Sequence, residues 1–273
     1  MPVRIVQSKQ NPRLKELRRV LSAPGRKFAG LVGIEGPNLV EEALRAKLRI
    51  QCVFAAGGFK DWVSRLPLSR QTEVLILPRE ILASALSTET PQPVAALVET
   101  PKWIWRDLVE NGSGRTPLIL VLAAIQDPGN LGTILRSAEA LGATGVVSLP
   151  GTVSEWNPKS VRASAGSVFR LPVLPVAVDE CFAVLREAGV TLLTTALRGG
   201  TPAREADLSR PTALLIGNEG NGIPTDLALQ ADAAITIPCP GPVESLNAAM
   251  AAGILLYEAS RQRSTPSARE RLP

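Results

Sequence analysis

Hydrophobic residues recur at two different periods along this chain, and their alternation predicts a layered α/β protein. After Asn11-Pro12, a pair typical of a helix start, apolar residues recur at helical spacing: Leu14, Leu17, Val20 and Leu21. Short apolar runs and amphipathic stretches then alternate along the sequence. We expect strands at 28–34, 50–55, 74–77 and 94–98, and helices at 36–46 and 78–86.

The alternation resumes at Pro117 with an apolar run through Ala124, which is typical of a strand buried on both faces. We expect further strands at 146–149, 173–176, 191–195, 213–216 and 234–237, and helices at 131–141, 178–188 and 245–260. Residues 101–116 break the pattern and contain Asn-Gly-Ser-Gly, which is typical of a linker. The chain therefore divides into a first domain at 1–105, a linker at 106–116, a second domain at 117–263 and a flexible tail at 264–273.

The absence of histidine from all 273 residues narrows the chemistry. It excludes a Ser-His-Asp triad, a Cys-His pair and any histidine-ligated metal. The three cysteines are widely spaced and match neither a disulfide framework nor a zinc pattern: Cys52, Cys181 and Cys239. We therefore expect no metal, and a reaction that relies on Arg, Lys, Glu, Asp, Asn, Ser or backbone groups.

No apolar run has the length of a signal peptide or a membrane span, the longest being residues 118–125. We expect a cytoplasmic protein with no membrane partner.

Charge is unevenly distributed between the two halves. Residues 1–105 carry 16 Lys and Arg against 9 Asp and Glu, whereas residues 106–273 carry 14 against 16. Basic clusters attract phosphate backbones, although a solvated basic face would look the same. The candidates for phosphate contact are Arg13, Lys15, Arg18, Arg19, Arg26 and Lys27.

The first of three polar loops, residues 126–130, follows the buried strand that opens the second half. α/β folds place ligands at such strand ends. Asn130 could instead simply cap the next helix. Arg136 lies further along that largely apolar helix, where an arginine needs a partner. The two side chains converge only if Asn130 precedes the helix and Arg136 reaches back, and together they would suit a phosphate or ribose.

The second loop, Gly217-Asn-Glu219-Gly-Asn-Gly222, follows the strand expected at 213–216. Its three glycines allow backbone to approach a ligand closely. The spacing differs from the GxGxxG dinucleotide fingerprint, and no Lys-Ser/Thr follows as in a phosphate-binding P-loop. The loop indicates another kind of ligand, or a plain glycine-rich turn, and Glu219 adds one carboxylate.

The third loop begins at Ile237 and contains three prolines, which hold it extended. Ser245 is the expected N-cap of the last helix. That helix is apolar nearly all round, so we expect it to be buried on more than one side. Asn247 is its polar exception, either as a site residue or as a satisfied buried amide.

Together the segments PGNLGTILRSAEALGA, LLIGNEGNGIP and IPCPGPVESLNAAMAAGILLYE resemble the three motifs of the SpoU (TrmH) RNA 2′-O-ribose methyltransferases. The resemblance covers residues 117–263. The first 100 residues also resemble the RNA substrate-binding domain often fused to such enzymes. The resemblance implies an α/β fold: a C-terminal α/β-knot domain of SPOUT type, with a deep trefoil knot, and a smaller N-terminal ribosomal-protein-like α/β domain.

The resemblance also implies a cofactor, S-adenosylmethionine, held by backbone at Gly217, Ile237 and Leu246. It implies a set of catalytic and substrate-binding side chains: Asn130, Arg136, Glu219, Ser245 and Asn247. It further implies a homodimer. Its substrate would be RNA, most often ribosomal RNA.

The chemistry of such a reaction needs no metal, because a sulfonium methyl is already activated. The enzyme must align the methyl with the ribose oxygen and help to remove the hydroxyl proton. The resemblance casts Arg136 as the base, but deprotonating a guanidinium is very costly. In a second scheme Arg136 holds a phosphate and stabilises the developing alkoxide, while Glu219 or solvent receives the proton.

Three other functions stay open alongside ribosomal RNA methylation. One is a ribose methyltransferase acting on transfer RNA. Another is a non-catalytic RNA-binding protein that uses the basic first half. The third is a nicotinamide-dependent enzyme, which the glycine spacing disfavours.

Overall fold

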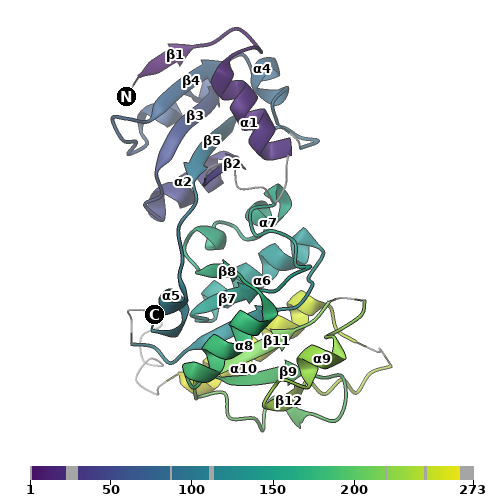
Figure 1. Cartoon of the computed structure of the whole chain (residues 1–273). Coiled ribbons are helices and arrows are strands. Elements are labelled where there is room, and N and C mark those ends of the chain that lie inside the picture. The colour runs from purple at the N-terminus through teal and green to yellow at the C-terminus, as the bar shows by residue number, and fades with distance from the viewer. Residues whose placement is uncertain are drawn as a thin grey trace, which may run out of the picture. The chain divides into compact units, whose positions relative to one another are not determined.

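The computed structural model of the chain describes residues 2–22, 30–86, 88–110, 114–218, 220–242 and 245–264. They form two compact units, each built on one β-sheet. Unit 1 comprises Met1–Lys102 and Ser154–Arg170, and unit 2 comprises Trp103–Val153 and Leu171–Pro273. Figure 1 shows the helices and strands of both units.

Unit 1 contains a five-stranded mixed sheet in the order β1-β4-β3-β5-β2. Its strands are β1 (Val3–Ile5), β2 (Leu31–Glu35), β3 (Ile50–Ala56), β4 (Glu73–Leu77) and β5 (Val94–Glu99). β5 runs antiparallel to both of its neighbours, and the other pairs are parallel. The helices are α1 (Pro12–Ser22), α2 (Pro37–Arg45), α3 (Lys60–Ser64), α4 (Arg79–Ala83) and α7 (Pro158–Ala163), with 3-10 turns η1 (Gly57–Phe59) and η2 (Ser167–Phe169).

Helix α1 confirms the helix expected after Asn11. The Asn11 side chain accepts hydrogen bonds from the backbone N–H groups of Arg13 and Leu14, at 2.9 and 3.3 Å, so it caps the helix. The four apolar residues of its repeat are buried against β2, β3 and β4. Burying each such side chain is worth about 1.5–3 kcal/mol, so this face fixes α1 on the sheet.

The segment Ser154–Arg170 comes from the middle of the second half of the sequence but packs with unit 1. Trp156 stacks on Phe169, with ring centroids 6.4 Å apart, and both are buried. Arg170 forms an ion pair with Glu42 of α2, and α7 contacts β2. The continuous range 117–263 that we expected as one domain is therefore shared between two compact units.

Unit 2 contains a seven-stranded sheet in the order β10-β12-β9-β11-β6-β7-β8, with every pair parallel. Its strands are β6 (Leu118–Leu122), β7 (Gly145–Ser148), β8 (Val173–Pro175), β9 (Thr191–Thr195), β10 (Thr201–Pro202), β11 (Thr212–Ile216) and β12 (Ala233–Thr236). The helices are α5 (Trp105–Val109), α6 (Pro128–Ala140), α8 (Val178–Glu187), α9 (Thr225–Ala228) and α10 (Ala248–Arg263).

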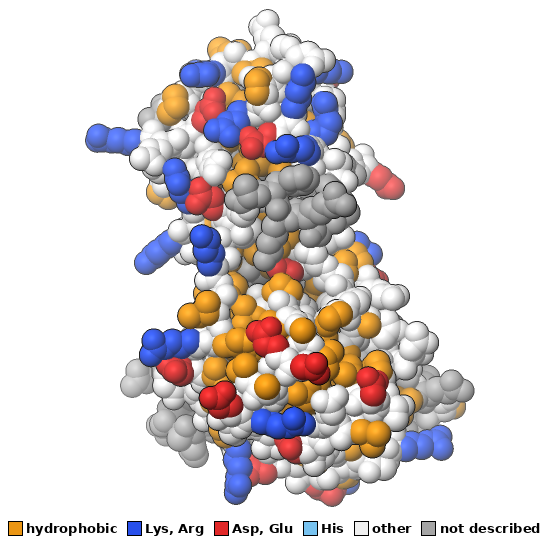
Figure 2. All heavy atoms as spheres, in the orientation of Figure 1, with side chains coloured by type: hydrophobic (Ala, Val, Ile, Leu, Met, Phe, Trp, Pro, Cys, Tyr) orange, Lys and Arg blue, Asp and Glu red, His pale blue; other side chains and the backbone are white. Residues whose placement is uncertain are grey.

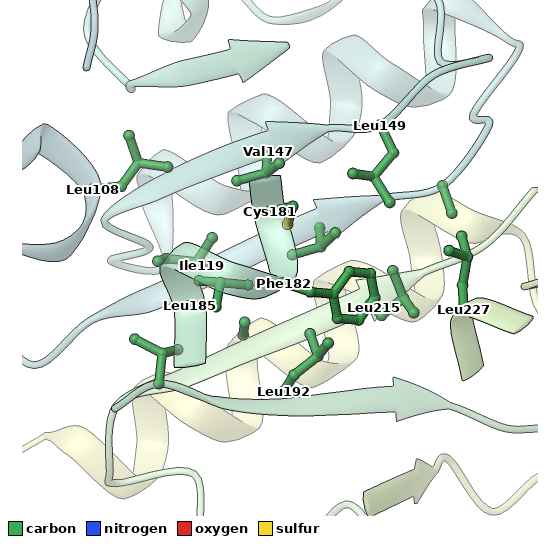
Figure 3. Close-up of a cluster of buried hydrophobic side chains, with 14 residues drawn as sticks. Leu108, Ile119, Val147, Leu149, Cys181, Phe182, Leu185, Leu192, Leu215 and Leu227 are labelled. Atoms are coloured by element: carbon green, nitrogen blue, oxygen red, sulfur yellow. The ribbon is translucent and has the colours of Figure 1, made fainter. Parts of the chain in front are cut away.

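Both faces of this sheet are covered, as Figure 1 shows with α8 in front and α10 behind. Phe182 and Leu185 of α8 pack against residues of the central strands, among them Ile119 and Leu215 (Figure 3). On the other face, α10 packs against α6 and β11. Because the central strands β6 and β11 are buried on both sides, they are continuous apolar runs, as the sequence predicted.

Part of the expected linker is a packed helix. Leu108 of α5 is fully buried in the cluster shown in Figure 3. A Cβ atom at Gly145 would lie 2.3 Å from Leu108 Cγ, so a glycine is needed there for this contact. Residues 111–113 and 265–273, which include three of the four residues of the Asn-Gly-Ser-Gly signal and nearly all of the expected tail, lie outside the described residues.

The pattern did not predict several short elements: β1, α3, α7, α9 and β10. Among the described residues, no helix has both the length and the apolar character needed to cross a membrane.

Candidate functional site

Polar loops gather at one edge of the unit 2 sheet. Because β12, β9, β11 and β6 are parallel neighbours, the loops that follow them leave the same edge. Residues 123–127 follow β6, residues 217–222 follow β11, and residues 237–247 follow β12. Parallel α/β sheets bind ligands at the carboxyl ends of their strands, so this edge is the candidate site.

Asn218 ties the first two loops together. Its side-chain Nδ2 donates to the carbonyl oxygen of Ala124 at 2.7 Å, and its Oδ1 accepts from the backbone N–H groups of Gly220 and Asn221. Ala124 has a left-handed backbone, with φ of +56°. Asn218 was not among the site residues expected from the sequence. Its place in a glycine-rich turn, where asparagine commonly bonds nearby backbone, was the available signal.

Gly217 stands where the second loop folds back on itself. The backbone groups of Asn218 and Gly222 pair in both directions at 3.0 Å. A Cβ atom at Gly217 would lie 2.5 Å from the Gly222 carbonyl carbon and 2.6 Å from the Ile223 nitrogen. Any side chain would therefore push the loop open, and the glycine keeps the backbone compact.

Asn130 and Asn247 join the first and third loops. Asn247 Nδ2 donates to Asn130 Oδ1 at 3.0 Å. Asn247 Oδ1 accepts from the backbone N–H groups of Ala249 and Met250, at 2.9 and 3.2 Å, which makes Asn247 the N-cap of α10. The expectation that Ser245 caps this helix was wrong, because α10 begins three residues later. Asn247 is exposed, so it is not a satisfied buried amide.

The prediction that Asn130 could cap α6 was also wrong. α6 begins at Pro128, and its N-cap is Asp127, whose carboxylate accepts from Gly129 N at 2.6 Å. Proline at the first helical position and an aspartate before it form a complete start signal. Asn130 therefore lies inside the first turn, where its side chain is available to Asn247.

Arg136 lies on the exposed face of α6. Within the part of the chain that the structure describes, nothing forms a hydrogen bond or ion pair with it. The expected partner in an apolar helix is missing because this position faces outward, whereas Ile134 and Leu135 face the core. Six residues on a helix separate side chains by about 120°, so Arg136 and Asn130 leave α6 in different directions. The convergence expected within the chain therefore does not occur.

The remaining expected site residues fall into two groups. Ile237 and Leu246 are half-buried and Ser245 is exposed, all within the loop that follows β12. Glu219 lies outside the described residues, and so do Arg26 and Lys27. Half-buried backbone at Gly217, at the same edge of the sheet as half-buried aliphatic side chains, fits an organic cofactor with an apolar ring and polar substituents. No group of described residues could hold a metal ion.

The basic candidates of α1 differ in their surroundings. Arg13 forms ion pairs with Glu16 and Glu73, at 2.9 and 3.1 Å. Arg18 donates to the carbonyl oxygen of Ser84 at 3.3 Å. Lys15 and Arg19 are exposed. Their positions four residues apart place these last two on the same side of the helix.

Two family models match the chain. Residues 117–257 match the model of the SpoU rRNA Methylase family. Residues 11–96 match the model of the MRM3-like substrate binding domain.

Individual relatives agree with both matches. The chain is 35% identical over 258 residues to the 23S rRNA (guanosine(2553)-2′-O)-methyltransferase RlmP of Bacillus subtilis, covering 92% of this chain and 97% of the relative. The AdoMet-bound rRNA methyltransferase from Sinorhizobium meliloti superposes with a TM-score of 0.84 at 32% identity, covering 96% of this chain and 99% of that one. The SpoU methyltransferase AviRb from Streptomyces viridochromogenes, in complex with AdoMet, superposes with a TM-score of 0.82 at 31% identity, with coverage of 93% and 98%.

Proposed function

The chain belongs to the SpoU rRNA methylase family, and from this premise we propose how its residues carry out methyl transfer. The protein is an S-adenosylmethionine-dependent 2′-O-ribose RNA methyltransferase. Unit 1 contains the mixed sheet of its substrate-binding domain, and unit 2 contains the parallel sheet of its knotted SpoU domain. The expected fold class, cofactor and reaction are thereby confirmed.

The Asn130–Asn247 hydrogen bond is the observation that carries the site assignment. It joins the first turn of α6, which follows β6, to the end of the loop after β12, at the edge where Gly217 is half-buried and has no room for a side chain. We propose that the backbone of Gly217, Ile237 and Leu246 holds the cofactor at this edge. When bound, the cofactor supplies a methyl group that is already activated for transfer.

The side chains around this edge would orient the ribose and manage its proton. We propose that Asn130, Asn247 and Ser245 position the substrate hydroxyl by hydrogen bonds. Arg136 is exposed and forms no hydrogen bond or ion pair with any residue that the structure describes. Its guanidinium is therefore available to an RNA phosphate and to the developing alkoxide. Glu219 or solvent would then receive the proton, a role that does not require a neutral arginine.

The RNA class follows from the relatives. The relative RlmP is named for a guanosine of 23S rRNA, and it matches nearly the whole chain. We propose that ribosomal RNA is the substrate, rather than transfer RNA. Action on ribosomal RNA would also place the protein in the cytoplasm. The basic residues of α1 would contribute to RNA binding.

We further propose that the protein is a homodimer that uses the outer face of α10. Met250 and Tyr257 are 58% and 62% exposed. They lie two helical turns apart on one face, with Ile254 between them. Exposed apolar side chains aligned in this way are typical of a surface that a partner covers. Light scattering coupled to gel filtration tests this, with Met250→Glu/Tyr257→Glu expected to shift a dimer to monomer. A monomeric wild type would contradict it.

The decisive experiment measures transfer of tritiated methyl groups from the cofactor to unmodified 23S rRNA, followed by mapping of 2′-O-methyl nucleotides. The Arg136→Ala variant should lose transfer and still bind cofactor by calorimetry. Equal activity in this variant would remove Arg136 from the site. RNA binding without cofactor binding in the wild type would instead favour a non-catalytic RNA-binding protein.

A further inference from the structure

Unit 1 has a hollow of about 660 Å³ at the N-terminal end of α1. Residues of β1, α1 and β4 line it, among them Arg4, Lys15 and Arg19. The register of the sheet explains the arrangement. Arg4 pairs with Leu75 in the β1–β4 ladder, and Leu75 packs against α1, so Arg4 lies on the α1 face of the sheet.

A second hollow of about 200 Å³ shares Arg13 with the first. Its other lining residues come from the start of β3 and the segment before β4: Arg49, Ile50, Gln51, Ser69 and Gln71. Arg13 thus stands between two adjoining hollows. We call the pair the α1 groove.

The α1 groove has an excess of positive charge. Five basic side chains line it, Arg4, Arg13, Lys15, Arg19 and Arg49, against two acidic ones, Glu16 and Glu73. Both carboxylates are already engaged. Glu73 pairs with Arg13 at 3.1 Å and with Arg4 at 3.7 Å, and Glu16 pairs with Arg13 at 2.9 Å.

Two cations are well placed to meet a ligand. Lys15 is exposed and forms no hydrogen bond or ion pair with any residue in the described ranges. The Arg49 side chain is 63% exposed even though it contacts Glu99 at 3.2 Å. Figure 2 shows Lys and Arg side chains distributed over the visible face of unit 1. The cations of the groove surround a concave surface.

We propose that the α1 groove binds the phosphate backbone of the RNA substrate, with Lys15 and Arg49 contacting phosphates on either side of Arg13. The proposal rests on the proposed RNA methyltransferase function. Cationic side chains beside amide and hydroxyl groups, here Gln51, Gln71 and Ser69, are the combination that contacts sugar and phosphate without reading bases.

The groove also revises which basic residues of α1 meet RNA. Arg18 lies outside it, because its guanidinium is bonded to Ser84 near α4. Arg13 acts mainly by neutralising Glu16 and Glu73, which would otherwise repel phosphate. Arg4 and Arg49, which the sequence did not single out, join the binding surface.

Filter binding of deproteinised 23S rRNA to the full-length protein tests the groove. The Lys15→Ala/Arg49→Ala variant should bind about 10-fold more weakly at 0.1 M salt, and its plot of log K against log salt should be shallower by about 2. The matched control, Lys60→Ala/Arg65→Ala, removes two exposed charges of unit 1 outside the groove and should bind like the wild type. Equal weakening in both variants would overturn the proposal.

A variant that is expected to bind RNA more tightly separates an effect on binding from an effect on folding, because a misfolded protein would bind more weakly. Glu73→Gln removes a carboxylate from the groove, frees Arg4 and leaves Arg13 paired with Glu16 alone, so it should bind RNA at least about 2-fold more tightly at low salt. Unchanged or weaker binding would count against the groove.

Methyl transfer by the wild type is measured separately. If the wild type transfers methyl groups but the groove variants bind RNA like the wild type, only this inference fails. If the groove variants change RNA affinity as expected but the wild type transfers no methyl group, only the proposed enzymatic function fails.

Discussion

Asn247 donates a hydrogen bond to Asn130 across 117 positions of sequence, at 3.0 Å. The same Asn247 side chain accepts the first free N–H groups of α10. One amide thus caps helix α10 with its oxygen and reaches the first turn of helix α6 with its nitrogen. The helix cap fixes the orientation of the amide, so the donor is held in place before any substrate arrives.

One substitution at Asn247 separates its role as the cap of α10 from its role as the donor to Asn130. Asn247→Asp keeps an acceptor for Ala249 N and Met250 N, and a carboxylate at a helix N-terminus is favourable, so Tm should not fall. It removes the donor to Asn130, and methyl transfer should drop by about 100-fold, as when a preorganised active-site group is lost. Thermal unfolding and single-turnover transfer measure the two effects. Asn247→Ala, which loses both contacts, should lower both; full transfer by Asn247→Asp would show that the donor is dispensable.

Gly217 should tolerate no side chain. Gly217→Ala places a Cβ within 2.5 Å of Gly222 backbone, so the loop must open, and cofactor affinity should fall by more than about 10-fold, a loss of about 1.4 kcal/mol. Gly220→Ala is the matched control, because its Cβ would meet only Asn218 Oδ1, at 3.6 Å. Isothermal calorimetry with S-adenosylmethionine compares them. Similar affinities for the two variants would place the cofactor elsewhere.

Arg263 should be a main support of the C-terminal helix. Its guanidinium donates to the carbonyl oxygens of Pro117, Leu208 and Arg210, among others, and burial lowers its pKa. Hydrogen bonds from a charged group contribute more than neutral ones, and Arg263→Ala should lower the free energy of unfolding by about 2–3 kcal/mol.

The control for this loss is Arg261→Ala, two residues earlier. The Arg261 side chain is 51% exposed and pairs only with Glu258, three residues earlier, so the urea midpoint should hardly move. An unchanged midpoint in Arg263→Ala would show that the loop carbonyls are equally well satisfied by water.

The three cysteines should differ in reactivity. Burial raises the pKa of the Cys181 thiol to about 12, and burial followed by the charge of Glu73 raises that of Cys52 as well. A raised pKa lowers the thiolate fraction at a given pH, and the thiolate is the reactive form. Cys239 is exposed in the loop after β12.

Iodoacetamide at pH 8 should therefore add one group to the native protein, on Cys239, and three after unfolding in guanidinium. Peptide mass spectrometry locates the adducts. S-adenosylmethionine should slow the reaction of Cys239 if the cofactor lies beside Ile237. Early labelling of Cys52 or Cys181 would contradict their burial.

The sequence by itself determined the main elements and the three loops of the site. Helical spacing of Leu14 and Leu17 predicted α1, and the apolar run from Pro117 predicted the central strand β6. These features are local, because a helix or strand presents its buried face at a fixed period whatever packs against it. The order of loops after parallel strands likewise placed the polar residues at one edge.

Tertiary structure alone decided which partners those residues meet. The N-caps of α6 and α10 are Asp127 and Asn247, not the expected Asn130 and Ser245. Each helix start offers more than one residue of a type that can cap, so the local sequence does not choose between them. Arg136 faces outward because α6 buries its other side. Ser154–Arg170 joins unit 1, where α7 contacts β2 and Arg170 pairs with Glu42. Such choices depend on contacts between residues far apart in the chain, which no local pattern records.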